Sequence, residues 1–118
     1  MMAHKPTAST SYALGYFYET LARWFLLLKG YKIIARRYKT SVGEIDLLVC
    51  KGKTLIAVEV KNRKHQKDSY YALTPYQMRR IKRTLLLAHK KFPQFYTIRC
   101  DTILISPYKW PIHILNAF

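Results

Sequence analysis

Three residues near the middle of the chain have the types and spacing that phosphodiester chemistry uses: Asp46, Glu59 and Lys61. Half of the six acidic residues, namely Glu44, Asp46 and Glu59, fall in one short stretch, although the chain carries 21 Lys and Arg and a formal net charge of +15. Glu59 stands between two valines, in a segment suited to burial, where a carboxylate is costly unless it is paired or coordinated to a cation. It therefore needs a specific partner.

A predicted hairpin supplies that partner. Residues 44–50 and 54–61 are rich in β-branched residues and predict two strands joined by a tight turn. If the loop contains two residues, Lys51 pairs with Thr54, and continuing the ladder puts the two carboxylates opposite each other, on the face that also carries the lysine. An odd-length loop or a bulge would break this correspondence.

Two adjacent carboxylates beside an ammonium group suit metal-assisted phosphoryl chemistry. Mg²⁺ or Mn²⁺ takes oxygen ligands and commonly keeps several waters, which leaves room for a phosphate oxygen. Lys61 would orient the attacking water or neutralise charge on the phosphate. The pattern predicts hydrolysis of a phosphodiester, with Asp46 and Glu59 as metal ligands and all three residues as the catalytic set.

Composition indicates a nucleic-acid partner. Basic residues occur from Lys5 to Lys109 beside ten tyrosines and two tryptophans, whereas a membrane-surface protein concentrates its charge on one amphipathic helix. The apolar stretch of residues 12–28 contains Glu19 and Arg23, which argues against a transmembrane helix and a membrane partner. The polar start shows no signal-peptide pattern, so we expect a cytoplasmic protein.

The remaining elements follow from periodicity and turn signals. They are a largely buried helix from Thr10 or Ser11 to about residue 29, a strand over residues 31–38, a helix over about 75–92, a strand over 96–105 and a short edge strand over 111–114. With the hairpin, this α-β-β-β-α-β order predicts an α/β domain whose mixed central sheet is flanked by helices. No linker divides it, so we expect a flexible arm over residues 1–10 and a single domain over residues 11–118.

Two groups of basic residues are candidates for contacts with nucleic acid. The first lies in the polar loop after the hairpin, and the second lies on one side of the second predicted helix. They comprise Arg63, Lys64 and Lys67, and Arg79, Arg80, Lys82 and Arg83. Any solvated amphipathic helix would look similar, but no acid stands between Asp68 and Asp101. We therefore predict a surface that follows the phosphate backbone of DNA.

These residues lie within a wider resemblance. The run Gly43-Glu44-Ile45-Asp46-Leu47-Leu48, followed by Val58-Glu59-Val60-Lys61, resembles the Asp…Glu-x-Lys signature of restriction-endonuclease-like (PD-(D/E)XK) nucleases. More closely, the chain is similar to the YraN-like family of small bacterial proteins, which are distantly similar to archaeal Holliday junction resolvases. The similarity also covers Glu19, Gly30-Tyr31, Arg36, Arg63, the second helix, Asp101 and Ala117-Phe118.

The resemblance implies a restriction-endonuclease-like fold and a metal-dependent endonuclease acting on DNA, including branched or structured DNA. It implies that Asp46 and Glu59 bind the metal, that Lys61 is the catalytic lysine, and that Glu19 is a further acid reaching the site. Resolvases of this kind act as dimers, which implies a homodimer. The sequence departs from the family pattern at Arg37, where asparagine is usual, and at Gln77, where a basic residue is commoner.

Simpler interpretations stay open for several of these residues. Glu59 and Lys61 also fit a salt bridge on a sheet face, and Glu19 fits an ion pair with Arg23 one helical turn later. Glu44 suits either an outer metal-shell role or an ion pair, and Gln77 is also placed to complete a capping box. For the whole protein, the alternative is a catalytically silent nucleic-acid-binding protein or a basic accessory factor of DNA or RNA processing.

Overall fold

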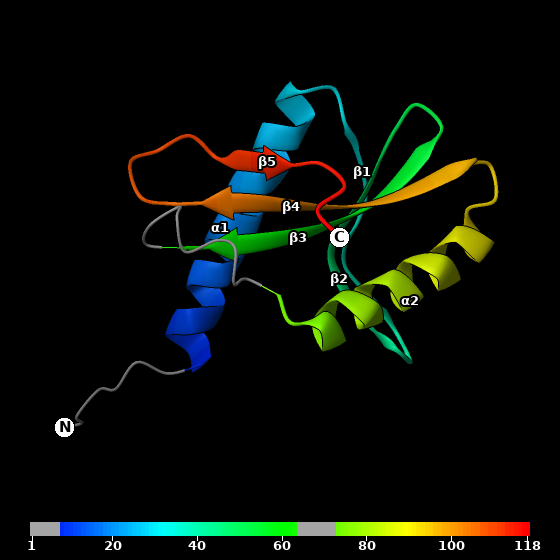
Figure 1. Cartoon of the computed structure of the whole chain (residues 1–118). Coiled ribbons are helices and arrows are strands. Elements are labelled where there is room, and N and C mark those ends of the chain that lie inside the picture. Colours follow the sequence, from blue (N-terminus) through cyan, green and yellow to red (C-terminus); the bar gives the residue numbers. More distant parts are fainter. Residues whose placement is uncertain (1–7, 64–72) are drawn as a thin grey trace.

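The structure of the protein is a computed structural model, in which residues 8–63 and 73–118 are described (Figure 1). Its elements are α1 (Ala8–Leu28), β1 (Lys32–Thr40), β2 (Gly43–Lys51), β3 (Thr54–Asn62), α2 (Pro75–Lys91), β4 (Thr97–Ile105) and β5 (Ile112–Ile114). This is the predicted order, including the short last strand. Residues 1–7 of the predicted arm lie outside the described residues. Residues 8–10 are helical, so α1 begins before the predicted cap.

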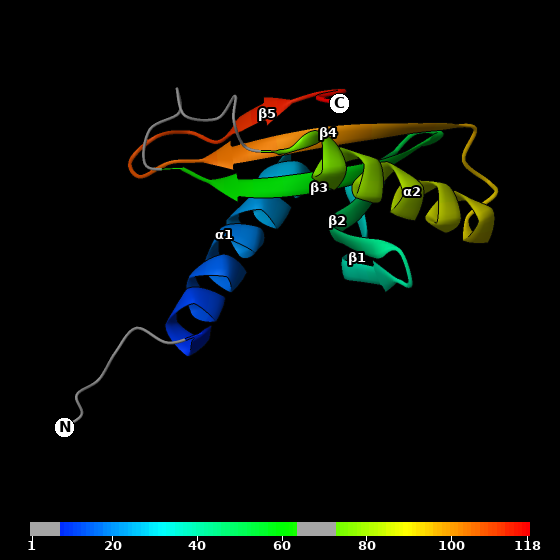
Figure 2. The ribbon, with the colours of Figure 1, turned by 60° about the horizontal axis from the view of Figure 1, so that its bottom comes forward.

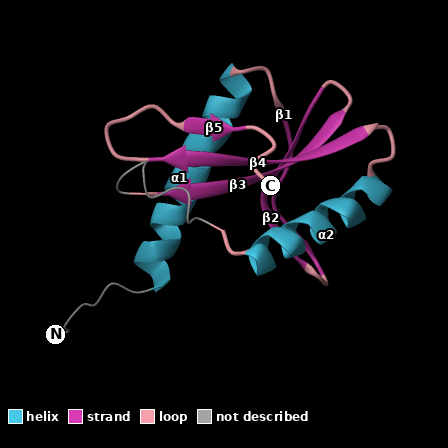
Figure 3. Cartoon of the chain, in the orientation of Figure 1, coloured by secondary structure: helices cyan, strands magenta, loops and turns pink. Residues whose placement is uncertain are grey.

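The described strands form one five-stranded sheet in the order β1-β2-β3-β4-β5. Neighbouring strands are antiparallel except β3 and β4, which are parallel. Parallel neighbours need a crossover connection, and α2 lies in the segment that connects these two strands. The predicted mixed sheet with flanking helices is therefore confirmed (Figure 3).

The two described helices cover opposite faces of this sheet (Figure 2). On one face, α2 packs Ile81, Leu85 and Ala88 against strand residues that include Leu48 and Ala57. On the other, α1 packs Ala22 and Leu26 against Leu47, Val49, Ile56, Val58 and Ile103. Both faces of β2 and β3 are thus buried, which explains their nearly continuous apolar sequences.

α1 is less buried than its apolar sequence predicts. Ala22 and Leu26 are fully buried, whereas Trp24 is 63% exposed and Leu28 is 81% exposed. Apolar residues occur almost all round this helix, but contact with a sheet buries only one stripe. The prediction of a largely buried helix is therefore wrong. No helix in the described part of the chain is long and apolar enough to span a membrane.

α2 begins with the capping box that its sequence suggests. The Thr74 side chain accepts a hydrogen bond from Gln77 N at 3.1 Å, and the Gln77 side chain accepts one from Thr74 N at 2.9 Å. Pro75 occupies the first turn, where its missing N–H costs nothing. The cap fixes the end of α2 that lies nearest the acidic residues of the hairpin.

A buried carboxylate on β4, that of Asp101, helps to hold the C-terminal segment on the sheet. It accepts two hydrogen bonds from Arg99, at 2.8 and 2.9 Å, and one each from the ring of His113 and from Asn116 N. Burial alone would raise the pKa of Asp101, but these donors hold it below its usual value. Asp101 therefore braces the fold through an arginine.

Replacing Asp101 is therefore expected to destabilise the protein strongly. Asp101→Ala leaves the donors of Arg99 and His113 without their acceptor and should lower the free energy of unfolding by about 3–5 kcal/mol. Urea denaturation followed by circular dichroism measures this loss. Glu44→Ala, at an exposed position, is the control and should change stability by no more than about 0.5 kcal/mol. Equal stability of the two variants would contradict this role of Asp101.

Candidate metal-binding active site

The β2–β3 hairpin has the register that the sequence predicts. Lys51 pairs with Thr54 across a two-residue turn, and the ladder continues without interruption to Leu47 opposite Val58. Gly52 in this turn has φ 59°, in the left-handed region that glycine adopts without strain. Extending the register by one step reaches the two predicted metal ligands.

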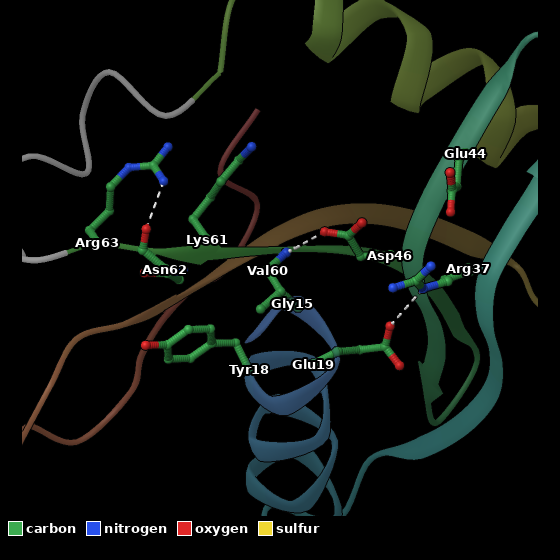
Figure 4. A pocket seen from close by; sticks show the side chains of 10 residues that line it. All are labelled: Gly15, Tyr18, Glu19, Arg37, Glu44, Asp46, Val60, Lys61, Asn62 and Arg63. Atoms are coloured by element: carbon green, nitrogen blue, oxygen red, sulfur yellow. Dashed lines mark hydrogen bonds and ion pairs between the residues drawn. The ribbon is translucent and has the colours of Figure 1, made fainter. Parts of the chain in front are cut away.

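Asp46 stands where β2 and β3 part. β2 remains paired with β1, whereas β3 continues beside β4 as far as Asn62 opposite Ile105. Asp46 Oδ2 accepts a hydrogen bond from Val60 N at 2.9 Å, so the side chain provides the acceptor that a paired strand would otherwise supply (Figure 4). The parting of the strands therefore fixes this carboxylate.

Two cavities meet at this point. One, of about 320 Å³, lies between α1 and the parting strands and is lined by Gly15, Tyr18, Glu19, Arg37, Glu44, Asp46, Val60, Lys61, Asn62 and Arg63 (Figure 4). The other, of about 500 Å³, lies towards α2 and is lined by Glu44, Asp46 and Glu59 together with Thr74, Tyr76, Gln77, Arg80 and Ile81. Asp46 and Glu44 line both. The structure thus brings together the acids and the lysine predicted from the sequence.

Lys61 forms an ion pair with Glu59, with its Nζ 3.2 Å from Glu59 Oε2. Both side chains are mostly buried, at 17% and 14% exposure, and both lie on the same face of β3 because side chains alternate along a strand. This is the salt bridge that the sequence left open as an alternative to catalysis. It also holds the ammonium group beside the acid pair.

Burial and the neighbouring charge of Asp46 disfavour the ionised form of Glu59, whereas a hydrogen bond from Glu59 favours the ionised form of Asp46. Burial raises the pKa of Glu59 to about 7, with a further contribution from the charge of Asp46 and an opposing one from Lys61. Burial also raises the pKa of Asp46, against the hydrogen bond from Val60 N. The electrostatic cost of two negative charges in a poorly solvated position is lowered when one of them binds a proton or when a cation binds beside them.

Glu19 reaches this region from α1 but is held by arginines. Its Oε1 lies 3.3 Å from Arg36 Nη1 and 3.9 Å from Arg23 Nε, and its Oε2 lies 3.4 Å from Arg37 Nε. Its side chain is only 7% exposed. The ion pair that the sequence offered as the alternative to metal binding is the one observed, and it has three partners rather than one.

Arg37 is the site residue whose role the sequence did not predict. Arg36 pairs with Leu47 and Tyr38 with Ile45 across β1 and β2, so Arg37 stands across from Asp46. Its φ is 48°, a strained value for a residue other than glycine. The one signal in the sequence that could have indicated this position is the family's usual asparagine, because asparagine tolerates a positive φ.

The other predicted residues divide into four groups. Arg79, Arg80 and Arg83 lie exposed on α2, and Arg80 Nε donates to Val42 O at 3.0 Å beside the second cavity. Arg63 lines the first cavity, and its Nη1 donates to Asn62 O. Gln77 completes the helix cap and also lines the second cavity. Lys64 and Lys67 lie outside the described residues.

The donor set fits a magnesium-type ion and does not fit a zinc site. Among the described residues, no group of three or more His, Cys, Asp and Glu side chains lies together as a metal cluster. Mg²⁺ needs fewer protein ligands, because it commonly binds through one or two carboxylates and keeps waters or phosphate oxygens in its other positions. Asp46 and Glu59 are two such carboxylates, and both line the second cavity.

The fold and site define an α/β protein with a mixed sheet, two covering helices and an acid pair with a lysine where two central strands separate. Comparison with known proteins places the chain in a family described as "Uncharacterised protein family UPF0102", whose model matches residues 18–105. This family membership agrees with the resemblance found in the sequence.

Similar proteins come from several bacterial species. The chain is 43% identical to a UPF0102 protein of Parvibaculum lavamentivorans over 95% of this chain and 86% of the relative. It is 37% identical to one of Mesorhizobium japonicum over 99% of this chain and 97% of the relative. For one of Rhizobium meliloti the identity is 36% over the full length of both. The similarity therefore extends along the whole chain.

The raised pKa of Glu59 predicts a pH-dependent stability. The folded protein binds this proton more tightly than the unfolded chain does, so stability falls as the pH rises from the usual 4.5 through about 7 and stays lower above that. Glu59→Gln removes this loss. In urea unfolding with chelator present, its stability relative to the native chain should increase by about 2 kcal/mol between pH 5 and pH 8. A difference that does not change with pH would contradict the buried acid pair.

Proposed function

We propose that this protein is a magnesium- or manganese-dependent endonuclease with a restriction-endonuclease-like fold that hydrolyses phosphodiester bonds in DNA. The observation that carries the proposal is the acid pair of Asp46 and Glu59 beside Lys61, at the point where β2 and β3 part. The mixed sheet, with these residues on adjacent strands, supports it, because the resemblance implies the same arrangement. The net charge of +15 supports a polyanionic substrate.

Asp46 and Glu59 would hold the metal. When bound there, Mg²⁺ supplies Lewis-acid chemistry: it lowers the pKa of a coordinated water and neutralises charge on the phosphate. Val60 N fixes the orientation of Asp46, and Lys61 fixes that of Glu59. Such supporting contacts hold the carboxylates in place for a ligand and reduce the reorganisation that binding requires.

Lys61 supplies a positive charge with three N–H donors close to the acid pair. In hydrolysis, a water oxygen bonds to phosphorus as the bond to one ester oxygen breaks, and negative charge builds up on the phosphoryl oxygens. An ammonium that donates to those oxygens, or to the attacking water, interacts more strongly with the transition state than with the ground state. Lys61 is therefore assigned to the rate rather than to substrate affinity.

Arg37 and Arg63 complete the cavity on either side of the acid pair. Both are placed to contact the phosphates that flank the bond being cut, as arginine does through paired N–H donors. Glu19 holds Arg37 in position through the 3.4 Å contact. We therefore assign Glu19 to positioning and not to metal binding.

DNA would lie across α2 and the cavities. Arg79, Arg80 and Arg83 are exposed on the helix whose first turn lines the second cavity. Lys64 and Lys67, which follow Arg63 in the sequence, are also assigned to contacts with the DNA. Contacts of this kind neutralise phosphates and carry no base sequence.

A catalytically silent DNA-binding protein is the second candidate, and one observation favours it. Glu59 already has a cationic partner in Lys61, which offsets part of the repulsion that would attract a metal. The basic surface would then be sufficient for function. Cleavage assays with metal and with chelator distinguish the two candidates.

Substitutions in the acid pair should abolish cleavage without loss of binding. Asp46→Asn removes the negative charge of a proposed metal ligand. It should lower the cleavage rate of linear, forked or four-way DNA at least about 100-fold in Mg²⁺ or Mn²⁺. Lys61→Ala should lower the turnover number at least about tenfold while the apparent affinity changes less than about twofold. Glu44→Gln is the matched control and should retain most activity. Full cleavage by Asp46→Asn would contradict the metal site.

Binding should depend on salt through α2. Removing a phosphate contact reduces the slope of log affinity against log salt concentration by about 0.9 on duplex DNA. Arg79→Ala with Arg83→Ala should therefore flatten the slope by about two and weaken binding to all sequences equally. Lys90→Ala with Lys91→Ala makes the same charge change at the other end of α2 and should have a clearly smaller effect. Equal effects of both double variants would mean that charge alone, not this surface, binds DNA.

A further inference from the structure

The outer side of α1 and the loop between β4 and β5 form an apolar groove of about 870 Å³. Its lining includes Phe17, Tyr18 and Trp24 from α1, and Tyr108 and Trp110 from the loop. Trp24 is 63% exposed and Trp110 79% exposed. Figure 2 shows α1 on the face of the sheet away from α2, below the end of β4 from which this loop begins. We refer to this feature as the aromatic groove.

The aromatic groove exposes a large apolar surface in one place. Large exposed side chains contribute on the order of 100 Å² each, so five or more of them amount to roughly 500 Å², a size at which an exposed apolar patch often marks an interaction site. The core does not explain them, since α1 meets the sheet through its opposite side, with Ala22 and Leu26. A ligand with large apolar faces is therefore expected here.

The aromatic groove adjoins the candidate active site. Tyr18 lines both the groove and the cavity that contains Asp46 and Lys61. Where β3 and β4 end, Arg63 N donates to Ile105 O at 2.9 Å, which joins a residue of the candidate site to a residue of the groove. A chain molecule leaving the site past Tyr18 would enter the groove directly.

The charges along the aromatic groove are all of one sign. Lys109 is the one charged residue among those that line it in the described structure. Lys29 lies at its far end, with Nζ 5.0 Å from the centre of the Phe25 ring, and Arg63 lies at its near end. An apolar floor with cations at both ends and beside its middle complements an anionic polymer that presents flat apolar rings.

We propose that the aromatic groove binds unpaired nucleobases of a single strand that continues from the active site. Single-stranded nucleic acid combines a phosphate backbone with exposed π-faces, and aromatic side chains bind such bases by stacking without regard to sequence. From Tyr18 to Leu28, α1 rises about 15 Å, a length that accommodates a few nucleotides. The inference rests on the proposed nuclease function for the path of the strand and makes DNA with unpaired bases beside the cut the preferred substrate.

A second copy of this chain is the competing occupant, and the charges argue against it. A symmetric contact through the groove would bring Lys29 and Lys109 towards their own equivalents, with no acidic residue among the described residues that line it. Opposed like charges reduce affinity, and the net charge of +15 on each copy adds to the repulsion. The state of association is therefore part of the test.

The two tryptophans of the chain, Trp24 and Trp110, both line the aromatic groove, so intrinsic tryptophan fluorescence reports on this surface alone. With chelator present, we titrate the full chain with a ten-nucleotide oligothymidylate, with an abasic oligonucleotide of equal length and with a blunt duplex. Saturable quenching is expected with oligothymidylate, at an affinity at least about fivefold higher than for the abasic strand. Equal affinities would overturn the proposal, because phosphates alone would then account for binding.

Two variants test the residues. Trp24→Ala and Trp110→Ala should each weaken oligothymidylate binding at least about fivefold, while duplex affinity changes less than about twofold. Tyr96→Ala removes another exposed aromatic side chain, next to Lys53 and outside the groove, and should leave both affinities unchanged. Single-strand binding that is unaffected by either tryptophan variant would overturn the proposal.

Two further outcomes separate this inference from its rivals and from the proposed function. A dimer in sedimentation velocity that Trp24→Ala dissociates would make the groove an interface between copies and overturn the proposal. Because binding is measured without metal, base-dependent binding together with absent cleavage would reject the nuclease and keep the groove. Cleavage of blunt and single-strand-containing substrates at equal rates, with no base-dependent quenching, would reject the groove as a base-binding site and keep the nuclease.

Discussion

Two carboxylates of like charge held close together in a poorly solvated position are the constraint on which the site depends. Val60 N fixes Asp46, and Lys61 holds Glu59, so neither acid is directed away from the other. Burial, with a further contribution from the charge of Asp46, raises the pKa of Glu59 to about 7, so that a proton relieves the cost of ionisation. The same physical cost predicts a pH-dependent stability and, under the proposed function, is the reason to expect an affinity for a divalent cation.

The sheet topology creates this constraint. β2 stays with β1 while β3 continues beside its parallel neighbour β4, so the strands separate at Asp46 and leave cavities towards both helices. α1 brings Glu19 to one side, where it binds Arg37, and α2 brings Arg80 to the other. The cations of the site therefore come from elements that are far apart in sequence but share the edge of one opening.

The sequence predicts those features that depend on residues close together in the chain. The hairpin register follows from a two-residue turn, and the capping box follows from Thr74 and Gln77, so both were predicted and confirmed. The partners of Glu19 depend on how α1 crosses β1, which periodicity does not specify, so only one of its three arginines was foreseen. The exposed side of α1 was missed because a helix that is apolar all round does not show which stripe meets the sheet.

The most direct test of the central claim is calorimetric titration of the protein with Mn²⁺ at several pH values. One ion should bind, with an affinity that increases as the pH rises through about 7 and Glu59 loses its proton. Asp46→Asn and Glu59→Gln should each abolish this binding, and Glu44→Gln should preserve it. Absence of Mn²⁺ binding by the native chain, or binding that survives both substitutions, would contradict the acid pair as a metal site.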